Sequence, residues 1–467
     1  MPKLSVEFDF NNLFAAGEHG LTDSDFAALA PRAEAAVRGV EKLHRAGELG
    51  FMDLPDQDCR EIERMARDIA KRFDNFVVLG IGGSALGNQA LYTALANPVS
   101  GVATTGAKRR GDKPRLFIAD NSDPTLLADI LDRCDLRKTL FNVISKSGGT
   151  VETAAQFLIC GDAVCRKVGQ KRAKDHFVIT TDPKKGVLRE IVELSGTRSL
   201  PIPSNVGGRF TALSSVGLLS SAVMGVNIRK LLAGAAKARA ACQSAQLFEN
   251  PALTAAAALY QLDQRGKKIH VLMPYAQKLR YVSDWFAQLW AESLGKKLDR
   301  SGRVVNVGPT PIKALGATDQ HSQLQLFLEG PNDKVVIFLS VENLGAIGKI
   351  PKNLGEYDEF GYLGGKTLAE LLRAEQRGTE IALTKNQRPN FNIRLDRVDE
   401  ESVGALLFLL EMQTAYAGEF YNINAFDQPA VELGKQYACG IMGRKGYEKF
   451  AAEAKQAKRN EQYVVSI

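Results

Sequence analysis

An amide and a carboxylate lie four positions apart on one predicted helix. Gln288 and Glu292 belong to a helical pattern that runs from Arg280 to Leu294, and residues at this spacing share a helix face. A carboxylate held in this way can act as a general base that moves a proton between neighbouring carbon atoms. The pair is also typical of a solvated helix end, so the spacing alone leaves both interpretations open.

Three basic side chains follow turns or begin helices elsewhere in the chain. Arg209 follows the glycine turn from Asn205 to Gly208, where its guanidinium can steady a developing oxyanion. His321 stands at a predicted helix start, and Lys435 stands three positions after Glu432. Taken singly, each is also typical of a structural ion pair or hydrogen bond.

Two loops with glycines follow predicted buried strands. The loop from Gly80 to Gly87 allows a ligand to approach the backbone closely. The loop from Ser145 to Thr153 brings the hydroxyls of Ser145, Ser147 and Thr150 to a helix start, which is typical of a phosphate-binding loop. It lacks the Gly-Lys-Ser/Thr ending of a nucleotide P-loop. Each loop is also compatible with a capped helix that binds no ligand.

A dinucleotide-binding site is one alternative for the first loop. Gly80, Gly82 and Ala85 match the loose Gly-x-Gly-x-x-Ala pattern. The acidic residue that ends the next strand, Asp120, lies much further along than that motif requires. A nicotinamide-dependent dehydrogenase would leave the hydroxyl-rich loop and Glu292 without a role.

Short apolar strands alternate with amphipathic helices along most of the chain, which predicts an α/β fold. Predicted strands cover residues 76–81, 116–119, 141–144, 177–180, 199–202, 270–273, 304–307, 335–339 and 391–395. Continuous apolar strands imply parallel sheets with helices on both faces, and such sheets bind ligands at the carboxyl ends of their strands. A helical stretch from 212 to 264 separates two units of similar type.

These patterns predict four regions. Residues 1–50 form an N-terminal extension whose helical pattern breaks at Pro31, 51–222 and 223–445 form the two α/β domains, and 446–467 form a C-terminal tail. Predicted helices after strands cover 84–96, 124–131, 151–168, 187–194 and 321–328, and longer ones cover 400–419 and 431–442.

The composition is that of a globular protein. The chain has 467 residues, 45% hydrophobic and 24% charged, with a formal net charge of +7. The densest basic run, at 107–110, has no interleaved aromatic residues and predicts a solvated loop rather than a nucleic-acid surface. None of the six cysteines forms a Cys-x-x-Cys pair, which favours buried cytosolic thiols. We expect neither a signal peptide nor a membrane span.

Taken together, six segments resemble the glucose-6-phosphate isomerase family, in the family's order and over most of the chain. They are Gly80–Gly87, Ser145–Thr153, Asn205–Phe210, Gln288–Lys296, Asp319–Gln325 and Asp427–Lys435. The length is similar to that of the shorter bacterial enzymes. The resemblance implies two sugar-isomerase (SIS) domains, each a parallel sheet between layers of helices.

The resemblance also implies the reaction and its catalytic groups. The substrates would be glucose 6-phosphate and fructose 6-phosphate, with Glu292 as the base between C1 and C2. Arg209 and the backbone near Gly208 would stabilise a cis-enediolate, and His321 and Lys435 would act in ring opening. The binding and orienting roles fall to Ser84, Ser145, Ser147 and Thr150 for the phosphate, Gln288 and Gln428 for the sugar, and Glu152 for the catalytic histidine.

The resemblance further implies a homodimer in which the histidine comes from the neighbouring subunit. The cysteine pattern and the N-terminal sequence predict a cytoplasmic location. The chemistry requires no cofactor and no metal ion. One position departs from the family, because Gly149 stands where a threonine is usual, and the effect on affinity stays open. Activity on mannose 6-phosphate also stays open. A sugar-phosphate sensor of the same fold is the second alternative, but it would not need Glu292, His321 and Lys435 together.

Overall fold

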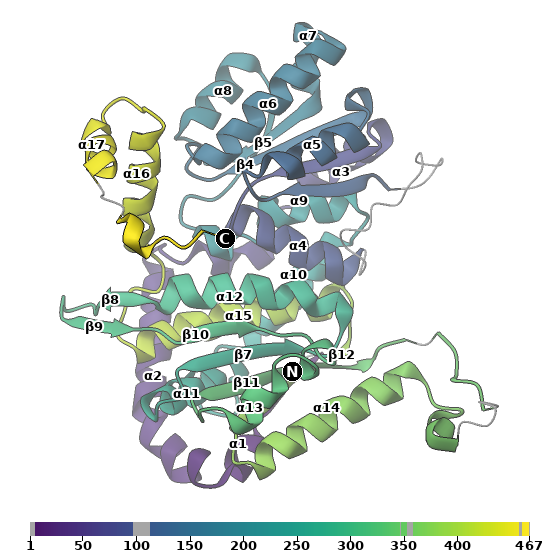
Figure 1. The fold of residues 1–467 in the computed structure, drawn as a ribbon, viewed down its shortest axis with the longest axis vertical. Helices are drawn as coiled ribbons and strands as arrows, with labels where there is room; N and C mark the ends of the chain where they lie inside the picture. The colour runs from purple at the N-terminus through teal and green to yellow at the C-terminus, as the bar shows by residue number, and fades with distance from the viewer. Residues whose placement is uncertain (1–4, 97–112, 346, 353–357, 457–459, 467) are drawn as a thin grey trace. The chain divides into compact units, whose positions relative to one another are not determined.

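The computed structural model describes residues 5–96, 113–345, 347–352, 358–456 and 460–466. The basic run at 107–110 lies outside them. The chain divides into two compact units, residues 1–425 and residues 426–467. Within the described residues, the larger unit contains two five-stranded sheets and one two-stranded sheet. The mixed α/β class predicted from the sequence is therefore confirmed (Figure 1).

The first sheet is parallel throughout. Its strands, in spatial order, are β3 (Arg115–Ala119), β2 (Asn75–Leu79), β4 (Thr139–Ser145), β5 (Phe177–Thr181) and β6 (Arg198–Pro201). Every residue of β2 and β4 is buried, as expected of strands covered on both faces. The accompanying helices are α3 (Arg60–Arg72), α4 (Gly83–Leu95), α5 (Pro124–Arg133), α6 (Val151–Val168), α7 (Gln170–Ala173), α8 (Val187–Ser195) and α9 (Ser215–Val223).

The order of these strands defines a crevice. β3 lies on one side of β2, whereas β4 lies on the other, so the chain reverses its direction of winding at this pair. In open α/β sheets, ligands bind outside the carboxyl ends of strands at such a reversal. The loops that leave β2 and β4 are the two glycine-containing loops singled out in the sequence.

The second sheet is also mainly parallel, as expected, with one antiparallel strand at its edge that the sequence did not predict. Its order is β1 (Val6–Asp9), β12 (Asn390–Arg397), β11 (Lys334–Asn343), β7 (Ile269–Pro274) and β10 (Thr310–Lys313), with β1 antiparallel to β12. The N-terminal segment therefore supplies an edge strand to a sheet built mostly from the C-terminal half. The boundaries 1–50, 51–222, 223–445 and 446–467 stay a prediction.

Several predicted elements differ from the structure. The strand at 304–307, β9 (Val304–Val307), pairs with β8 (Lys296–Leu298) in the separate two-stranded sheet. The predicted break at Pro31 is wrong, because α2 (Asp23–Arg45) continues through it. Proline removes one helical hydrogen bond, but the buried stripe of α2 runs on from Leu29 to Ala33 and keeps the helix packed.

Packed helices connect the two sheets. In Figure 1, α4 and α12 (Arg280–Leu294) lie side by side between them, and the two helices are in contact. The helix α15 (Glu400–Phe420) is almost wholly buried and packs on α10 (Ile228–Ala241), α11 (Pro251–Gln264) and α2. This packing brings α12 of the second half to the crevice of the first sheet.

The remaining helices are α1 (Asn11–Ala15), α13 (Leu324–Glu329) and α14 (Leu368–Lys385), together with α16 (Glu432–Ile441) and α17 (Glu448–Gln456) of the smaller unit. None of the helices in the described part of the chain is long and apolar enough to cross a membrane. All six cysteines are free, and five of them are buried, as predicted.

Candidate active site

The loop between β4 and α6 forms a small hydroxyl-lined turn. The Ser145 and Thr150 hydroxyls lie 2.8 Å apart, and the Gly149 N–H donates to Ser147 Oγ at 3.3 Å. Thr150 is the N-cap of α6, yet its side chain makes no capping hydrogen bond. The first N–H groups of α6 therefore have no side-chain cap, and a helix start of this kind favours an anion.

Gly148 shapes this turn. Its φ of +68° lies in the left-handed region, and a Cβ atom there would lie 3.1 Å from Gly186. A side chain at position 148 would therefore strain the backbone and clash with the neighbouring loop at Gly186. Gly149 differs, because a Cβ atom there would meet nothing within 4 Å. The departure from the family at position 149 thus leaves space where a threonine would fit.

The loop after β2 contacts the loop that carries Arg209. A Cβ atom on Gly83 would lie 2.1 Å from the Gly208 carbonyl oxygen, so only a glycine allows this approach. The Thr211 hydroxyl donates to the Gly208 carbonyl at 2.7 Å and lies 3.3 Å from that of Gly83. Ser84 is half-buried in the first turn of α4, directly beside this contact.

Arg209 and Gln288 hold the Glu292 carboxylate between them. Arg209 Nη1 lies 3.4 Å from Glu292 Oε2, and Gln288 Nε2 donates to Glu292 Oε1 at 3.1 Å. The Arg209 side chain is 1% exposed, whereas that of Glu292 is 34% exposed. A buried guanidinium needs charged and polar partners, and Arg209 also donates to Ser293 Oγ at 2.7 Å and to the Ala425 carbonyl at 2.6 Å.

The loops and α12 therefore converge on one place. A Cβ atom on Gly82 would lie 3.0 Å from Gln288 Nε2, so the β2 loop lies against the helix that carries the carboxylate. Five predicted site residues lie in or directly beside these contacts: Ser84, Gly208, Arg209, Gln288 and Glu292. The result is a carboxylate oriented by an amide, with a cation beside it, next to the loop that leaves β2.

His321 is presented on an anchored turn, and not at the start of a helix as predicted. It follows a short 3-10 turn, Thr318–Gln320, and α13 begins only at Leu324. The Leu315 N–H donates to Asp319 Oδ2 at 2.7 Å, and Gln320 Nε2 donates to the Tyr275 hydroxyl at 2.8 Å. Burial opposes the charge of Asp319, but hydrogen bonds from Ser322, Gln323 and Leu315 outweigh it and lower its pKa.

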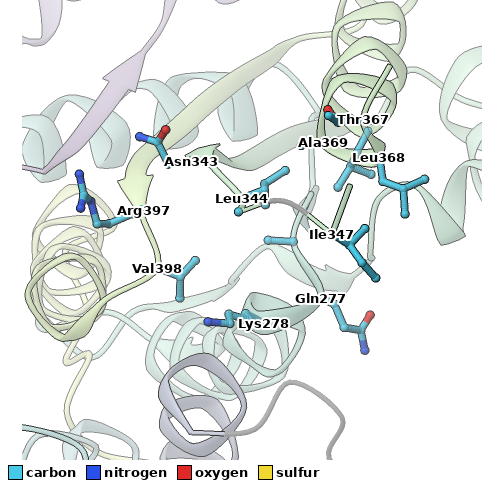
Figure 2. A pocket seen from close by; sticks show the side chains of 13 residues that line it. Gln277, Lys278, Asn343, Leu344, Ile347, Thr367, Leu368, Ala369, Arg397 and Val398 are labelled. Atoms are coloured by element: carbon cyan, nitrogen blue, oxygen red, sulfur yellow. The ribbon is translucent and has the colours of Figure 1, made fainter. Parts of the chain in front are cut away.

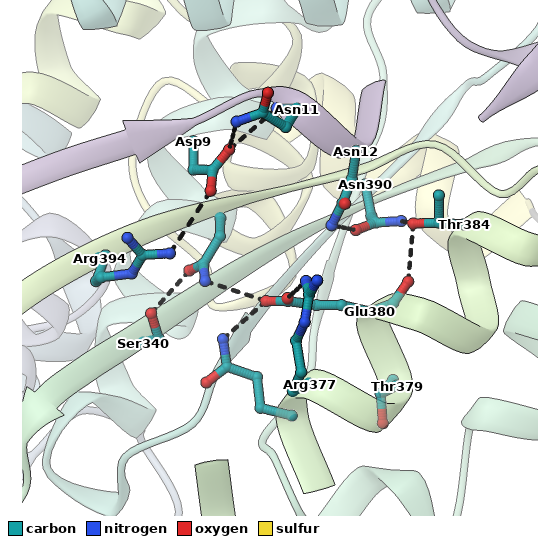
Figure 3. A network of polar contacts seen from close by, with 12 residues as sticks. Asp9, Asn11, Asn12, Ser340, Arg377, Thr379, Glu380, Thr384, Asn390 and Arg394 are labelled. Atoms are coloured by element: carbon teal, nitrogen blue, oxygen red, sulfur yellow. Dashed lines mark hydrogen bonds and ion pairs between the residues drawn. The ribbon is translucent and has the colours of Figure 1, made fainter. Parts of the chain in front are cut away.

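The hydrogen bonds that hold this turn extend to the buried face of α14. Gln320 Nε2 also donates to the Thr379 hydroxyl. One residue further, buried Glu380 accepts from Gln376, Arg377 and Asn392 at 2.9–3.0 Å, in the network of Figure 3. His321 itself is exposed, and among the described residues its ring makes no hydrogen bond or ion pair, with Glu152 or any other side chain.

Two predicted site residues belong to the smaller unit. Lys435 and Glu432 form an exposed pair on α16, with Lys435 Nζ 2.8 Å from Glu432 Oε1. This is the i,i+3 pair that their spacing predicts. Gln428 immediately precedes the short turn Pro429–Val431 that leads into α16.

The prediction missed one residue, Lys146. Its ammonium donates to the carbonyl oxygens of Ser204 and Val206 at 2.8 and 2.7 Å. Burial lowers the pKa of Lys146, and the nearby charge of Asp182 opposes that shift. Its position between Ser145 and Ser147 marks it as part of the loop, but nothing in the sequence indicates that the side chain turns toward residues 204–206.

A separate hollow lies at the second sheet (Figure 2). It has a volume of about 650 Å³ and opens where β11 and β12 end, near Asn343, Thr367 and Arg397. In the part of the chain that the structure describes, its lining contains Lys278 and Arg397 but no carboxylate or imidazole, and so offers no group suited to proton transfer at neutral pH. Among the described residues, no group of three or more His, Cys, Asp or Glu side chains is placed to bind a metal ion.

The fold and the site define the class: two linked α/β sheets, a hydroxyl-lined loop at a helix start and a carboxylate oriented by an amide and a guanidinium. The phosphoglucose isomerase family model matches residues 65–455. The glucose-6-phosphate isomerase of Carboxydothermus hydrogenoformans is 44% identical over 99% of this chain and 100% of its own length. The chain belongs to the phosphoglucose isomerase family, and the resemblance read from the sequence is confirmed.

Two solved structures share the fold. A hypothetical protein from Thermus thermophilus is 37% identical with a TM-score of 0.83, and the match covers 94% of this chain and 100% of that one. A glucose-6-phosphate isomerase from Chlamydia trachomatis is 23% identical with a TM-score of 0.71, over 95% of this chain and 81% of that one. At that identity the second likeness is one of fold.

Proposed function

We propose that this chain interconverts glucose 6-phosphate and fructose 6-phosphate by moving one proton between C1 and C2. Family membership and the near full-length relative support the reaction. The observation that carries it in this chain is the position of the Glu292 carboxylate between Gln288 and Arg209. One base, one cation and a remote anion site are the parts that an enediolate mechanism requires.

In the open-chain aldose, Glu292 takes the proton from C2, and the electron pair of that bond forms a C1–C2 double bond. The carbonyl electrons move onto O1, which becomes an oxyanion near Arg209. Returning the proton from Glu292 to C1, and moving the hydroxyl proton from O2 to O1, leaves a carbonyl at C2. Proton transfer from a positioned base contributes about 10²–10⁴-fold, and the arginine adds electrostatic stabilisation of the oxyanion.

The phosphate would bind at the start of α6. Ser145, Ser147 and Thr150 offer hydroxyls, and Ser84 offers another from the start of α4. Phosphate binding far from the reacting carbons lets binding energy orient C1 and C2. The Gln288 amide oxygen is buried without a hydrogen-bond partner among the described residues, which suits it to accept from a sugar hydroxyl.

Ring opening requires a group that protonates the ring oxygen and one that removes the C1 hydroxyl proton. We assign these steps to His321 and Lys435, with Gln428 lining the sugar and Glu152 orienting the histidine. The exposure of His321 and its lack of a partner within the described residues support a role in a neighbouring subunit's site. A homodimer with shared sites, the four-region division and a cytoplasmic location are part of this proposal.

A coupled assay tests the reaction. Fructose 6-phosphate is supplied to purified protein, glucose 6-phosphate is followed through its dehydrogenase, and Glu292→Gln is the matched variant because it keeps the shape of the side chain. Turnover that falls by about 10²–10⁴-fold in the variant supports both the reaction and its base. No turnover by folded wild-type protein would instead favour a sugar-phosphate sensor, and equal turnover would place the base elsewhere.

A further inference from the structure

The side chain of Lys146 leaves the phosphate loop for the backbone of another loop. Its neighbours Ser145 and Ser147 belong to the hydroxyl-lined turn, but the ammonium donates to the carbonyl oxygens of Ser204 and Val206. Two hydrogen bonds of 2.8 and 2.7 Å from a charged donor are strong ones. They fix the position of the ammonium group, which is therefore not free to move onto a bound phosphate without breaking them.

The loop that accepts these bonds leads directly to Arg209. Residues 202–207 form no helix or strand, and inside this stretch only the Val206 N–H to Pro203 carbonyl bond is a backbone turn. Its shape therefore depends on contacts with other segments. Two residues beyond Val206 comes Gly208, whose carbonyl meets Gly83, and then Arg209, which reaches Glu292.

Asp182 strengthens the same connection. Its Oδ2 accepts from the Ser204 hydroxyl at 3.0 Å, and its Oδ1 accepts from the Lys184 and Lys185 N–H groups. Burial opposes the charge of Asp182, but these hydrogen bonds and the nearby ammonium of Lys146 outweigh it and hold its pKa below the usual value. The lysine and the aspartate thus fix Ser204 from two sides.

We propose that Lys146 is a positioning residue that couples the phosphate loop to the loop carrying Arg209, so that phosphate binding sets the alignment of the enediolate-stabilising guanidinium. The inference rests on the proposed isomerase function and deepens it. A phosphate seated at Ser145, Ser147 and Thr150 fixes the backbone of residue 146, and its side chain carries that constraint to Ser204 and Val206. The coupling acts on the transition state, where the oxyanion develops, rather than on substrate affinity.

The test compares Lys146→Gln with Lys267→Gln. Lys267 is a suitable control because its ammonium, like that of the half-buried Lys146, donates to a backbone carbonyl, in this case that of Asn332, away from the site. Burial lowers the pKa of Lys267 as it does that of Lys146. Both variants lose a charged hydrogen bond to a backbone carbonyl, so a general loss of stability affects both.

For Lys146→Gln we expect kcat to fall by about 10- to 100-fold, the effect of a misaligned catalytic group. The dissociation constant of inorganic phosphate, measured by calorimetry, should change much less. A phosphorylated hydroxamate, whose planar anionic group mimics the enediolate, should lose affinity in parallel with kcat, whereas a phosphorylated sugar alcohol of the same length should not. Lys267→Gln should leave all four quantities near their wild-type values.

Two outcomes would overturn the inference. If inorganic phosphate and both inhibitors weaken equally while kcat holds, Lys146 contacts the phosphate itself. If Lys146→Gln and Lys267→Gln have the same kinetic constants, the lysine is only structural. Should Lys146→Gln fail to fold, Lys146→Arg keeps charge and donors, and its hydroxamate-to-alcohol affinity ratio decides between coupling and phosphate contact. An inactive wild type that still binds phosphate would refute the proposed function separately.

Discussion

Arg209 Nη1 lies 3.4 Å from Glu292 Oε2, while the same guanidinium is fixed by Ser293 and by the carbonyl of Ala425. The arginine is thus held by residues from α12 and from the segment that follows α15. Because it is buried and fully engaged, its position changes little when a ligand enters. Fixed dipoles and charges of this kind stabilise a developing oxyanion without reorganising at the moment of reaction.

Replacing this arginine by lysine should separate charge from geometry. Lysine keeps the charge, but its compact ammonium cannot reach Ser293, Glu292 and Ala425 at once. We expect kcat of Arg209→Lys to fall by about 10²–10³-fold, the effect of losing one oxyanion-stabilising donor, and KM to change less. Steady-state kinetics measure both, with Arg239→Lys, which alters an ion pair to Asp56, as the control. Wild-type kcat in Arg209→Lys would mean that charge alone is sufficient.

Two adjacent glycines in the phosphate loop should respond in opposite ways to alanine. Gly149→Ala meets nothing within 4 Å and has no positive φ, so it should raise the free energy of unfolding by about 0.4–1 kcal/mol through the unfolded chain. Gly148→Ala places an alanine in the left-handed region, with its Cβ atom 3.1 Å from Gly186. It should lower the free energy of unfolding by about 1–2 kcal/mol.

Urea unfolding at constant slope gives both values. Gly148→Ala should also raise KM, because the shifted backbone moves the hydroxyls of the loop. Equal unfolding midpoints for the two variants would show that the turn relaxes at no cost and is not shaped by Gly148.

His270 should make the protein sensitive to mild acid. It is fully buried on β7, accepts from Trp290 Nε1 at 3.1 Å, and burial lowers its pKa from 6.5 to about 3. Between these values the unfolded chain binds a proton that the folded protein does not. Stability therefore falls as pH drops below about 6.5, by roughly 1.4 kcal/mol per pH unit, until the folded pKa is reached.

Unfolding free energies at about pH 7 and about pH 5 measure this loss, which should be on the order of 2 kcal/mol larger in wild type than in His270→Asn. Asparagine keeps an acceptor for Trp290 but does not titrate. Identical pH dependence in the two proteins would mean that His270 is protonated in the folded state as readily as in the unfolded chain.

The sequence was most informative where structure is local. The apolar run before Gly80 predicts β2 because a strand covered on both faces needs no polar residues. The sequence analysis did not predict strand β10. Pro311 is unfavourable inside a sheet but tolerated at an edge, and β10 lies at a sheet edge. Helix α14 was missed although Thr367 and Glu370 form a capping box that marks its start.

The sequence contains no comparable signal for contacts between segments that lie far apart in the chain. Strand β1 pairs with β12, from Val6 opposite Leu395 to Asp9 opposite Asn392. The pattern of apolar residues in each segment does not indicate which strand it pairs with. The same holds within the site. Gln288 and Glu292 could be paired from their spacing, but the reach of Arg209 to Glu292, and of Lys146 to Val206, depends on how the loops pack.

Subunit mixing should decide where His321 acts. In the proposed dimer each site combines Glu292 of one subunit with His321 of the other. A dimer of one Glu292→Gln chain and one His321→Asn chain then contains one intact site and one site with both changes. Random exchange makes half of the dimers mixed, so two inactive proteins should recover about one quarter of wild-type activity when they are mixed after partial denaturation and refolding.

The control is the double variant carrying both substitutions in one chain, mixed with an equal amount of wild type. Its mixed dimers contain two sites with one change each, so subunit exchange should lower the activity of this mixture to about half of its starting value. If each histidine instead served its own subunit, the first mixture would stay inactive and the second would keep its activity. The two mixtures therefore give opposite results for the two arrangements, and a coupled assay before and after subunit exchange distinguishes them.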